Sequence, residues 1–324
     1  MNFDLIAPAN VAEAVSQMLT NPGARYISGG TDLIPNLRRG IGAPDVLIGL
    51  DGIDELKIVD ETDTHVVIGA TVTLAALAET DLPDRFPALG AVAEVAGPAL
   101  RQAATVGGNL CLDTRCLFYN QSKWWRKANR FCLKLDGDIC HVAPNGNRCH
   151  AAFSGDLAPA LLVLGAEIKI AGKQGQRWKP LNDLYREDGL AHLALSHEDL
   201  LVAVRIPVAS SDLRSGYLKS RLRKAVDFPL AGVAVALKRE GNLITALRIA
   251  VTGTNSRPLL FEDFAEVIGQ ELNEERLTAV AKQIGQLIKP MRTTNLPGLY
   301  RRQMAGVLVR RLLTGLYEGA GRGE

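Results

Sequence analysis

The sequence is poor in aromatic residues, in net charge and in long apolar runs, and these shortages exclude several classes of protein. Phe, Trp and Tyr make up only 5% of the 324 residues. The formal net charge is +2, so no overall field favours nucleic acid or a membrane surface as a partner. No apolar run reaches the roughly 18 residues of a membrane-spanning helix, and the opening MNFDLIAPAN does not read as a secretory signal. We therefore expect a cytoplasmic protein that binds neither nucleic acid nor membrane.

The length allows more than one domain, and the apolar pattern divides the chain into three regions. Residues 1–55 have a βαβ-like rhythm, with a helix over 9–20 that Asn10 can cap. Residues 56–210 form the second region, which ends at a polar break that begins at Pro207. The strands expected in these two regions cover 24–27, 46–50, 56–59, 65–69, 167–171 and 200–206, and the later helices cover 74–79, 88–96 and 157–164.

The third region, residues 211–324, predicts a small sheet covered by helices. Three strands are expected over 216–222, 231–238 and 247–252, and two helices over about 273–288 and 297–317. A run of strands followed by a run of helices is typical of an α+β unit. We therefore expect an α+β protein. Within its second domain, residues 111–150 show no clear period, and a loop of that length is usually functional.

A glycine-rich turn, Ser28-Gly29-Gly30-Thr31-Asp32, lies between an expected strand and an expected helix. Glycines allow backbone amides to point outward and to approach a ligand closely. Successive amides at the start of a helix form a site for an anion such as a phosphate. The alternative is a tight turn with nothing bound.

A second turn of this kind is Thr105-Val106-Gly107-Gly108-Asn109. Two such turns in one chain predict that the pyrophosphate of a dinucleotide lies across both. Neither turn has the Walker lysine pattern or the GxGxxG fingerprint, so a P-loop or a Rossmann site is not expected.

A third candidate is the segment that runs from Ser154 to Ala160. Two interpretations stay open at this point. Ser154 or Asp156 can cap the following helix, or Asp156 can face a ligand ring and form a hydrogen bond with it.

All five cysteines fall within one window of 39 residues. Four of them follow the spacing Cys116-x15-Cys132-x7-Cys140-x8-Cys149, while Cys111 lies beside the second glycine turn. An odd number of clustered cysteines in a cytosolic chain favours metal or redox chemistry over disulfides. Four thiolates suit zinc or an iron–sulfur cluster, but zinc ligands usually come as short C-x2-4-C pairs, which are absent here. We expect Cys111 to be a packing residue.

The residues between these cysteines are basic and aromatic. Seven Arg or Lys and two Asp lie from Arg115 to Arg148, a local charge of +5. These cations can stabilise an anionic cluster and can steer an acidic partner to it; the alternative is an ordinary solvated face. The aromatic residues that can cover the site are Phe118, Tyr119, Trp124, Trp125 and Phe131.

Taken together, the three glycine-containing motifs resemble the FAD motifs of the flavoprotein subunits of xanthine oxidase and carbon monoxide dehydrogenase, and the likeness covers essentially the whole chain. Within that family, the cysteine spacing, Phe118–Ser122, Trp124–Arg126 and the segment 225–233 are similar to the beta subunits of the 4-hydroxybenzoyl-CoA reductases. Most other relatives lack the insertion 111–150, so it is the specific signal.

The resemblance implies a two-subdomain FAD-binding fold of the PCMH type, with an extended FAD, and a C-terminal three-stranded sheet with helices. It implies a [4Fe–4S] cluster on Cys116, Cys132, Cys140 and Cys149. It also implies a large subunit that holds molybdopterin, a small subunit with two [2Fe–2S] clusters, and ferredoxin as the electron donor. The implied cofactor-binding residues are Ser28, Gly29, Gly30, Thr31, Asp32, Leu33, Thr105, Gly107, Gly108, Asn109, Asp113, Asp156 and Lys219.

Three functions follow from these observations. The first is an oxidoreductase subunit without a catalytic residue of its own, which relays electrons from ferredoxin through the cluster and FAD to molybdenum. The partner then dehydroxylates 4-hydroxybenzoyl-CoA to benzoyl-CoA in anaerobic aromatic degradation. The second is the FAD subunit of an oxidising molybdenum hydroxylase, in which electrons flow outward. The third is a zinc-stabilised scaffold that has lost flavin binding.

Overall fold

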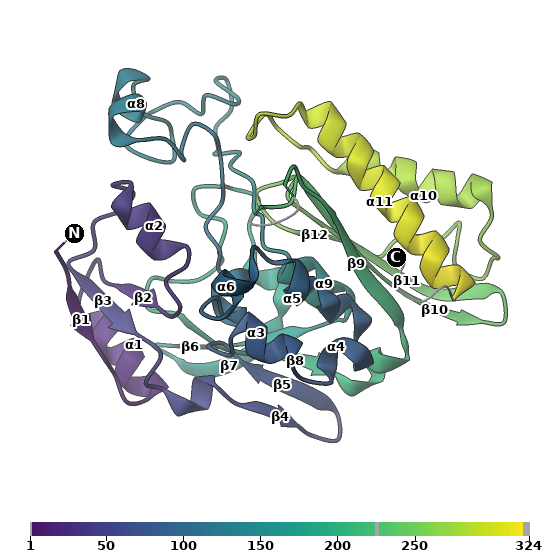
Figure 1. Cartoon of the computed structure of the whole chain (residues 1–324), viewed down its shortest axis with the longest axis horizontal. Coiled ribbons are helices and arrows are strands. Elements are labelled where there is room, and N and C mark those ends of the chain that lie inside the picture. Colours follow the sequence, from purple (N-terminus) through teal and green to yellow (C-terminus); the bar gives the residue numbers. More distant parts are fainter. Residues whose placement is uncertain (1, 224–226, 320–324) are drawn as a thin grey trace.

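In the computed structural model, which describes residues 2–223 and 227–319, three β-sheets are covered by helices (Figure 1). This arrangement confirms the α+β fold. Ala225 and Val226, which belong to one of the segments compared above, lie outside the described residues.

The N-terminal sheet is parallel and has the strand order β1-β3-β2. Its helix α1 begins as predicted, because the Asn10 side chain accepts a 2.9 Å hydrogen bond from the Glu13 amide. Strand β1 was not expected, since three residues are too few to show a period. The elements are β1 (Asp4–Ile6), α1 (Val11–Thr20), β2 (Arg25–Ile27), α2 (Leu33–Arg38) and β3 (Val46–Gly49).

The second sheet is antiparallel, with the order β4-β5-β8-β6-β7. Helices α3, α4, α5, α7 and α9 pack on it around a core of mainly aliphatic side chains. The elements are η1 (Asp54–Leu56), β4 (Val59–Glu61), β5 (His65–Gly69), α3 (Leu74–Ala78), α4 (Leu82–Arg85), η2 (Pro87–Gly90), α5 (Ala91–Glu94), α6 (Pro98–Arg101), α7 (Val106–Leu110), α9 (Leu157–Val163), β6 (Glu167–Gly172), β7 (Gly175–Pro180), η3 (Leu181–Leu184) and β8 (Leu200–Pro207).

Three expectations in this region are wrong. Residues 56–59 are not one strand, because Leu56 ends the 3-10 turn η1 and β4 begins only at Val59. The helix expected over 88–96 is divided into η2 and α5 and stops at Glu94, since Val95 is extended and Ala96 has a φ of 42°. The second glycine turn is itself the short helix α7.

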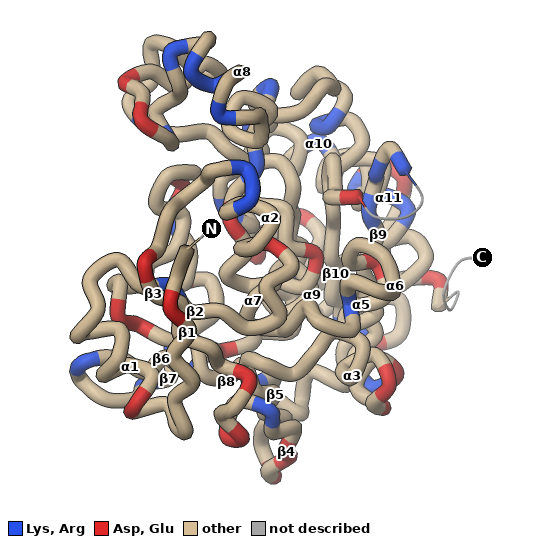
Figure 2. The backbone as a smooth tube through the Cα atoms, turned by 60° about the vertical axis from the view of Figure 1, so that its left-hand side comes forward, with Lys and Arg blue, Asp and Glu red and all other residues tan. Residues whose placement is uncertain are grey.

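The segment between α7 and α9 is largely irregular and contains one helix, α8 (Lys123–Ala128). We call residues 111–150 the Cys-rich segment. At its base, Arg115 and Ala152 exchange two backbone hydrogen bonds of 2.7 Å. The segment projects from the sheets beside α2, and Figure 2 shows several Lys and Arg residues gathered along this projection.

The C-terminal sheet is antiparallel, with the order β12-β11-β10-β9. It has four strands where three were expected, because β12 is a three-residue strand without a detectable period. The elements are η4 (Val208–Asp212), β9 (Arg214–Ser220), β10 (Ala231–Glu240), β11 (Leu243–Thr252), β12 (Leu259–Phe261), α10 (Glu274–Leu287) and α11 (Gly298–Glu318).

Strand β10 joins the C-terminal sheet to the rest of the molecule through its alternating faces. Val233, Val235 and Leu237 pack with α10 and α11, whereas Ala234 and Ala236 belong to the core of the second sheet and α9. The small side chains of these alanines let the C-terminal sheet lie close to α9. Among the described residues, no helix combines the length and the apolar character required to cross a membrane.

Candidate functional site

The first glycine turn lies between β2 and α2 and presents free backbone donors. Within the described part of the chain, the amides of Gly29, Gly30 and Thr31 donate no hydrogen bond. Gly30 has a φ of 65°, which L-residues rarely adopt. A Cβ on Gly29 would stand 1.6 Å from the carbonyl oxygen of Ala103, so residues 28–33 lie directly against the chain that leads into Thr105. The turn therefore meets the requirements of an anion-binding loop.

The second motif does not present free amides to a ligand as expected, because the amides of Val106, Gly107 and Gly108 donate hydrogen bonds within the protein. The Val106 and Gly107 amides donate to the carbonyls of Val72 and Ala70 at 2.9 and 2.8 Å. The Gly108 amide donates to the Thr105 hydroxyl, which caps α7, at 3.2 Å. A Cβ on Gly107 would approach the Ala70 Cβ to 2.8 Å, so this glycine serves packing. Gly108 is exposed.

The third motif adjoins the second through Asn109. The Asn109 side-chain oxygen accepts a 3.0 Å hydrogen bond from the Leu157 amide at the start of α9. A Cβ on Gly155 would lie 2.7 Å from the Asn109 carbonyl oxygen. The fold thus brings together all three motifs, which are far apart in the sequence.

Asp156 is buried and stands at the N-cap position of α9, but its side chain forms no capping hydrogen bond with the helix. Its carboxylate accepts a 2.6 Å hydrogen bond from the Tyr217 hydroxyl and forms a 3.1 Å ion pair with Lys219. Burial raises the pKa of Asp156 to about 6, against the opposite effects of Lys219 and Tyr217. Lys219 also donates to the carbonyls of Glu94 and Asp227. These contacts tie α9 to strand β9.

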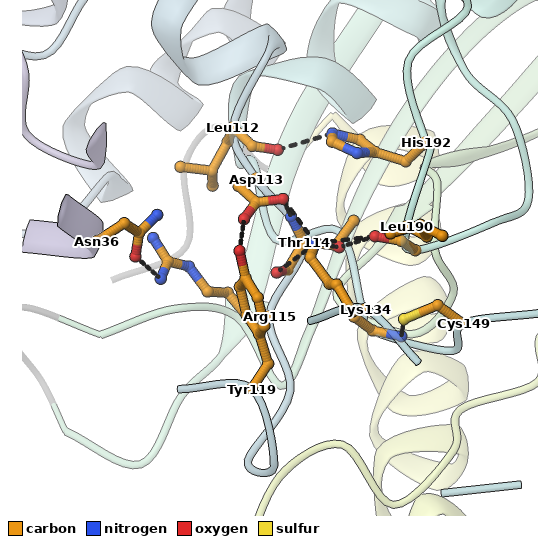
Figure 3. Close-up of polar contacts among 12 residues, drawn as sticks. Asn36, Leu112, Asp113, Thr114, Arg115, Tyr119, Lys134, Cys149, Leu190 and His192 are labelled. Carbon is orange, nitrogen blue, oxygen red and sulfur yellow. Dashed lines mark hydrogen bonds and ion pairs between the residues drawn. The ribbon is translucent and has the colours of Figure 1, made fainter. Parts of the chain in front are cut away.

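Asp32 of the first motif is bound to the Cys-rich segment. Its carboxylate forms an ion pair with Arg115. Arg115 also donates a 3.0 Å hydrogen bond to the side-chain oxygen of Asn36 (Figure 3). Arg115 is largely buried, and this burial lowers its pKa. The side chain of Asp32 therefore helps to hold the Cys-rich segment on α2.

Asp113 is surrounded by donors from the same segment. Its carboxylate lies 2.6 Å from Lys134 Nζ and accepts a 3.0 Å hydrogen bond from the Tyr119 hydroxyl (Figure 3). Lys134 also donates to both oxygens of Thr114 and, at 2.8 Å, to the carbonyl of Gly189. The Lys134 ammonium is thus buried, fully partnered and neutralised by a carboxylate.

The four cysteines of the predicted ligand set are buried and line one small cavity. Cys111 ends α7, packs against the core of the second sheet and does not line this cavity. Trp124 does not cover the site as expected, since it is 77% exposed. The other residues that line the cavity are Phe118, Tyr119, Leu133, Lys134, His141, Val142 and Ala151.

The surroundings of the sulfur atoms are apolar but include backbone donors. Burial raises the pKa of Cys116 to about 11, and the amides of Phe118 and Tyr119 oppose this effect. Burial likewise raises the pKa of Cys149 to about 12, opposed by the Ala151 amide, which donates to Cys149 Sγ at 3.4 Å. Amide donors of this kind stabilise a thiolate. Within residues 2–223 and 227–319, no group of three or more His, Cys, Asp or Glu side chains could hold a metal ion.

The basic residues of α8, together with Arg130 just after it, divide into exposed and buried ones. Lys123, Lys127 and Arg130 are exposed, as a docking surface requires. Arg126 is buried, so it cannot belong to such a surface. The sequence pattern did not separate it from its neighbours, because a six-residue helix without a clear apolar stripe does not reveal its inner face.

Two family descriptions match the chain. Residues 1–209 match the FAD binding domain in molybdopterin dehydrogenase, and residues 216–316 match the CO dehydrogenase flavoprotein C-terminal domain. The chain belongs to the family of FAD-binding subunits of molybdenum hydroxylases. It is accordingly an oxidoreductase subunit.

Similar proteins cover almost the whole chain. The carbon monoxide dehydrogenase medium chain of Afipia carboxidovorans is 29% identical over 96% of this chain and 95% of its own length. The xanthine dehydrogenase FAD-binding subunit of Escherichia coli is 25% identical, over 97% of this chain and 95% of its own. Among solved structures, a chain of reconstituted CO dehydrogenase from Oligotropha carboxidovorans is 26% identical and has a TM-score of 0.81. The match covers 99% of this chain and 99% of that chain.

Proposed function

We propose that this flavoprotein subunit also holds a [4Fe–4S] cluster and relays electrons between a one-electron carrier and a molybdenum subunit. The observation that carries the proposal is the gathering of four buried cysteines around one cavity, with the fifth cysteine outside it. When bound, the cluster passes single electrons and FAD stores two. The chain itself positions both cofactors and tunes their surroundings.

The residues around the glycine motifs fit FAD. The unused amides of Gly29, Gly30 and Thr31 would hold its pyrophosphate, and Thr105–Asn109 would approach it from the adjoining loop. Asp156 and Lys219 form a buried ion pair, and we propose that the flavin ring lies against this pair. Asp32 and Asp113 have protein partners already, so we assign them to the wall of the site.

The cavity of the Cys-rich segment fits a cluster better than a single ion. Its four thiols line a common space, although no group of three or more His, Cys, Asp or Glu side chains in the described residues is placed to hold a metal ion. A cluster has the width to reach separated thiolates, whereas tetrahedral zinc needs sulfur atoms about 2.3 Å from one centre. Amide donors to sulfur atoms and apolar cover from Phe118 are further features of cluster sites.

The partners follow from the names of the relatives. Several are called medium chains or FAD-binding subunits, so we propose a large molybdenum-binding subunit and a small [2Fe–2S] subunit for this protein as well. The substrate reaction would take place on the molybdenum subunit. The exposed cations Lys123, Lys127 and Arg130 suit an acidic carrier such as ferredoxin.

The proposed direction of electron flow is inward, toward molybdenum. A carrier that delivers one electron at a time needs a relay before a flavin, and the four-cysteine cavity would supply that relay. Two electrons and two protons would convert 4-hydroxybenzoyl-CoA into benzoyl-CoA and water, which is the reductive function implied by the Cys-rich segment. The outward direction of an oxidising hydroxylase is the second candidate, and the names of the relatives, dehydrogenases and a hydroxylase, favour it.

An anaerobic purification of the complex tests these proposals. Iron, acid-labile sulfide, zinc, molybdenum and flavin are counted per chain, and the midpoint potentials of flavin and cluster are measured. We expect one FAD and eight irons per set of three subunits, four of them in the [4Fe–4S] cluster of this chain and four in the two [2Fe–2S] clusters of the small subunit. For inward flow we also expect the potential of the [4Fe–4S] cluster to lie below that of the flavin. Zinc in place of iron and sulfide would overturn the cluster. A cluster potential above that of the flavin would support the oxidising function.

A further inference from the structure

A buried arginine of the C-terminal domain faces the Cys-rich segment. Arg301, in the first turn of α11, is 1% exposed. Its guanidinium donates to the carbonyls of Leu230 and Met291 at 3.0 and 2.9 Å, and to the Thr293 hydroxyl at 2.9 Å. All three acceptors are neutral.

Thr293 connects Arg301 to the cysteine cavity. Its carbonyl oxygen accepts a 2.8 Å hydrogen bond from the amide of Leu117, the residue that follows Cys116. Burial lowers the pKa of Arg301 to about 10, and the group that opposes this effect is the Cys116 thiolate. The hydrogen bonds of Thr293 to Arg301 and to Leu117 therefore join α11 to the part of the Cys-rich segment that carries Cys116.

Among residues 2–223 and 227–319, Arg301 forms no ion pair with a carboxylate. The cation of every ion pair in this part of the chain is a residue other than Arg301. A buried charge without a counter-ion is costly, and such charges are normally paired or bound to a metal site. Lys134, on another side of the cavity, offers a contrast because Asp113 neutralises it at 2.6 Å.

We propose that Arg301 is a positioning residue for the four-cysteine site, whose anionic charge when loaded is the missing counter-ion of its guanidinium. This inference rests on the proposed cluster and adds that the C-terminal domain completes the site. The site becomes one unit more negative on reduction, so a fixed buried cation favours the reduced state and raises the midpoint potential. The C-terminal helix α11 is in this way part of the electron relay.

Three variants of the full chain test this role after reconstitution with iron and sulfide. Arg301→Met removes the buried charge and Arg301→Lys keeps it. Lys127→Met removes an exposed charge from the Cys-rich segment. At a fixed potential we expect Arg301→Met to lower the ratio of reduced to oxidised cluster on the order of tenfold, which is about 59 mV for one electron. Arg301→Lys and Lys127→Met should stay close to the wild type, since solvent screens the exposed charge.

Thermal unfolding separates this role from a structural one. If Arg301 merely joins Leu230 to Met291, Arg301→Met will lower Tm equally with and without iron and sulfide. We expect instead that reconstitution raises Tm less in Arg301→Met than in the wild type. If Arg301→Met does not assemble the cluster, Arg301→Lys decides: a cluster with nearly the wild-type potential supports the inference, and a lost or strongly shifted cluster overturns it.

Two negative results have different meanings. A wild-type chain that takes up no iron and sulfide contradicts the proposed function itself. A loaded wild-type chain whose potential and gain in Tm are unchanged by Arg301→Met contradicts only the role of Arg301.

Discussion

The guanidinium of Arg126 donates a 3.1 Å hydrogen bond to the carbonyl oxygen of Arg39, so a side chain of α8 is anchored on the turn after α2. A second hydrogen bond of 3.2 Å reaches the carbonyl of Gly40, and others reach carbonyls within the Cys-rich segment. The residue is fully buried. The one helix of the Cys-rich segment is therefore held against the element that follows the first glycine turn.

Replacement of Arg126 with Gln should destabilise this junction. Charged hydrogen bonds contribute about 1.5–3 kcal/mol each. We expect a loss of roughly 3 kcal/mol in the free energy of unfolding, together with faster chymotryptic cleavage at Trp124 and Trp125. Lys127→Gln is the matched control and should change stability by less than about 0.5 kcal/mol. Equal cleavage of the two variants would contradict the anchor.

Exposed cations on α8 and just after it should govern the delivery of electrons. The triple variant Lys123→Gln, Lys127→Gln and Arg130→Gln removes three exposed charges and leaves Arg126 in place. Electrostatic steering raises association rates, and salt screens it over about 8–10 Å. We expect slower reduction by ferredoxin at low salt and a flatter dependence of the rate on salt, measured by stopped-flow absorbance. An unchanged low-salt rate with intact iron content would show that another surface docks the carrier.

Gly30→Val should remove FAD. The substitution places a side chain at a φ of 65° and crowds the Ile34 side chain at 3.1 Å, and it also blocks access to the free amides. The strain of a positive φ costs about 1–2 kcal/mol by itself. Gly23→Val controls for this strain, because Gly23 has a φ of 94° and open space around it. Flavin absorbance per chain should fall in the first variant and persist in the second.

Changing the cysteines one at a time to Ser tests the ligand set. Loss of Cys116, Cys132, Cys140 or Cys149 should remove most of the four-iron signal in the EPR spectrum of the reduced protein. Cys111→Ser should retain that signal, because Cys111 lies outside the cavity. The set is wrong if Cys111→Ser loses iron while one of the other four variants keeps it.

His192 should make the protein less stable in acid. Burial, with a smaller effect from Lys134, lowers the pKa of His192 to about 4, and Nε2 donates to the Leu112 carbonyl at 2.9 Å (Figure 3). In the unfolded chain the pKa of His192 is near 6.5. Between pH 6.5 and 4 the unfolded chain therefore binds more protons at this residue than the folded chain does. This contribution to stability is complete above pH 6.5, falls as the pH drops to 4, and amounts to about 3 kcal/mol.

His192→Gln keeps a donor for the Leu112 carbonyl but cannot take up a proton. Urea unfolding of both proteins at about pH 7 and about pH 5 measures the difference. We expect the wild type to lose more stability than the variant over this interval. Parallel losses would mean that His192 is protonated in the folded state, with an ordinary pKa.

Local signals in the sequence predicted much of the fold. Asn10 identified the start of α1, and the strand expected over 231–238 is the greater part of β10. The three-residue strands β1 and β12 carry no such period. Helix α7 was mistaken for a turn because Gly107 and Gly108 have low helix propensity, which packing on Ala70 overrides.

The candidate site was predictable where its residues are adjacent in sequence. The spacing of the four cysteines indicated one site, and the structure gathers them around a cavity. Arg301 and the buried position of Arg126 had no local signal. Both depend on contacts with distant segments, which local patterns do not encode.

The backbone pairing of Arg115 with Ala152 has a consequence for the length of the chain between them. The chain leaves the core at Arg115 and re-enters it at Ala152, so the two ends of this long segment lie side by side. Closing a loop costs only about 0.6 kcal/mol more for each doubling of its length. The fold can therefore carry a segment of this length between α7 and α9 for little additional loss of chain entropy.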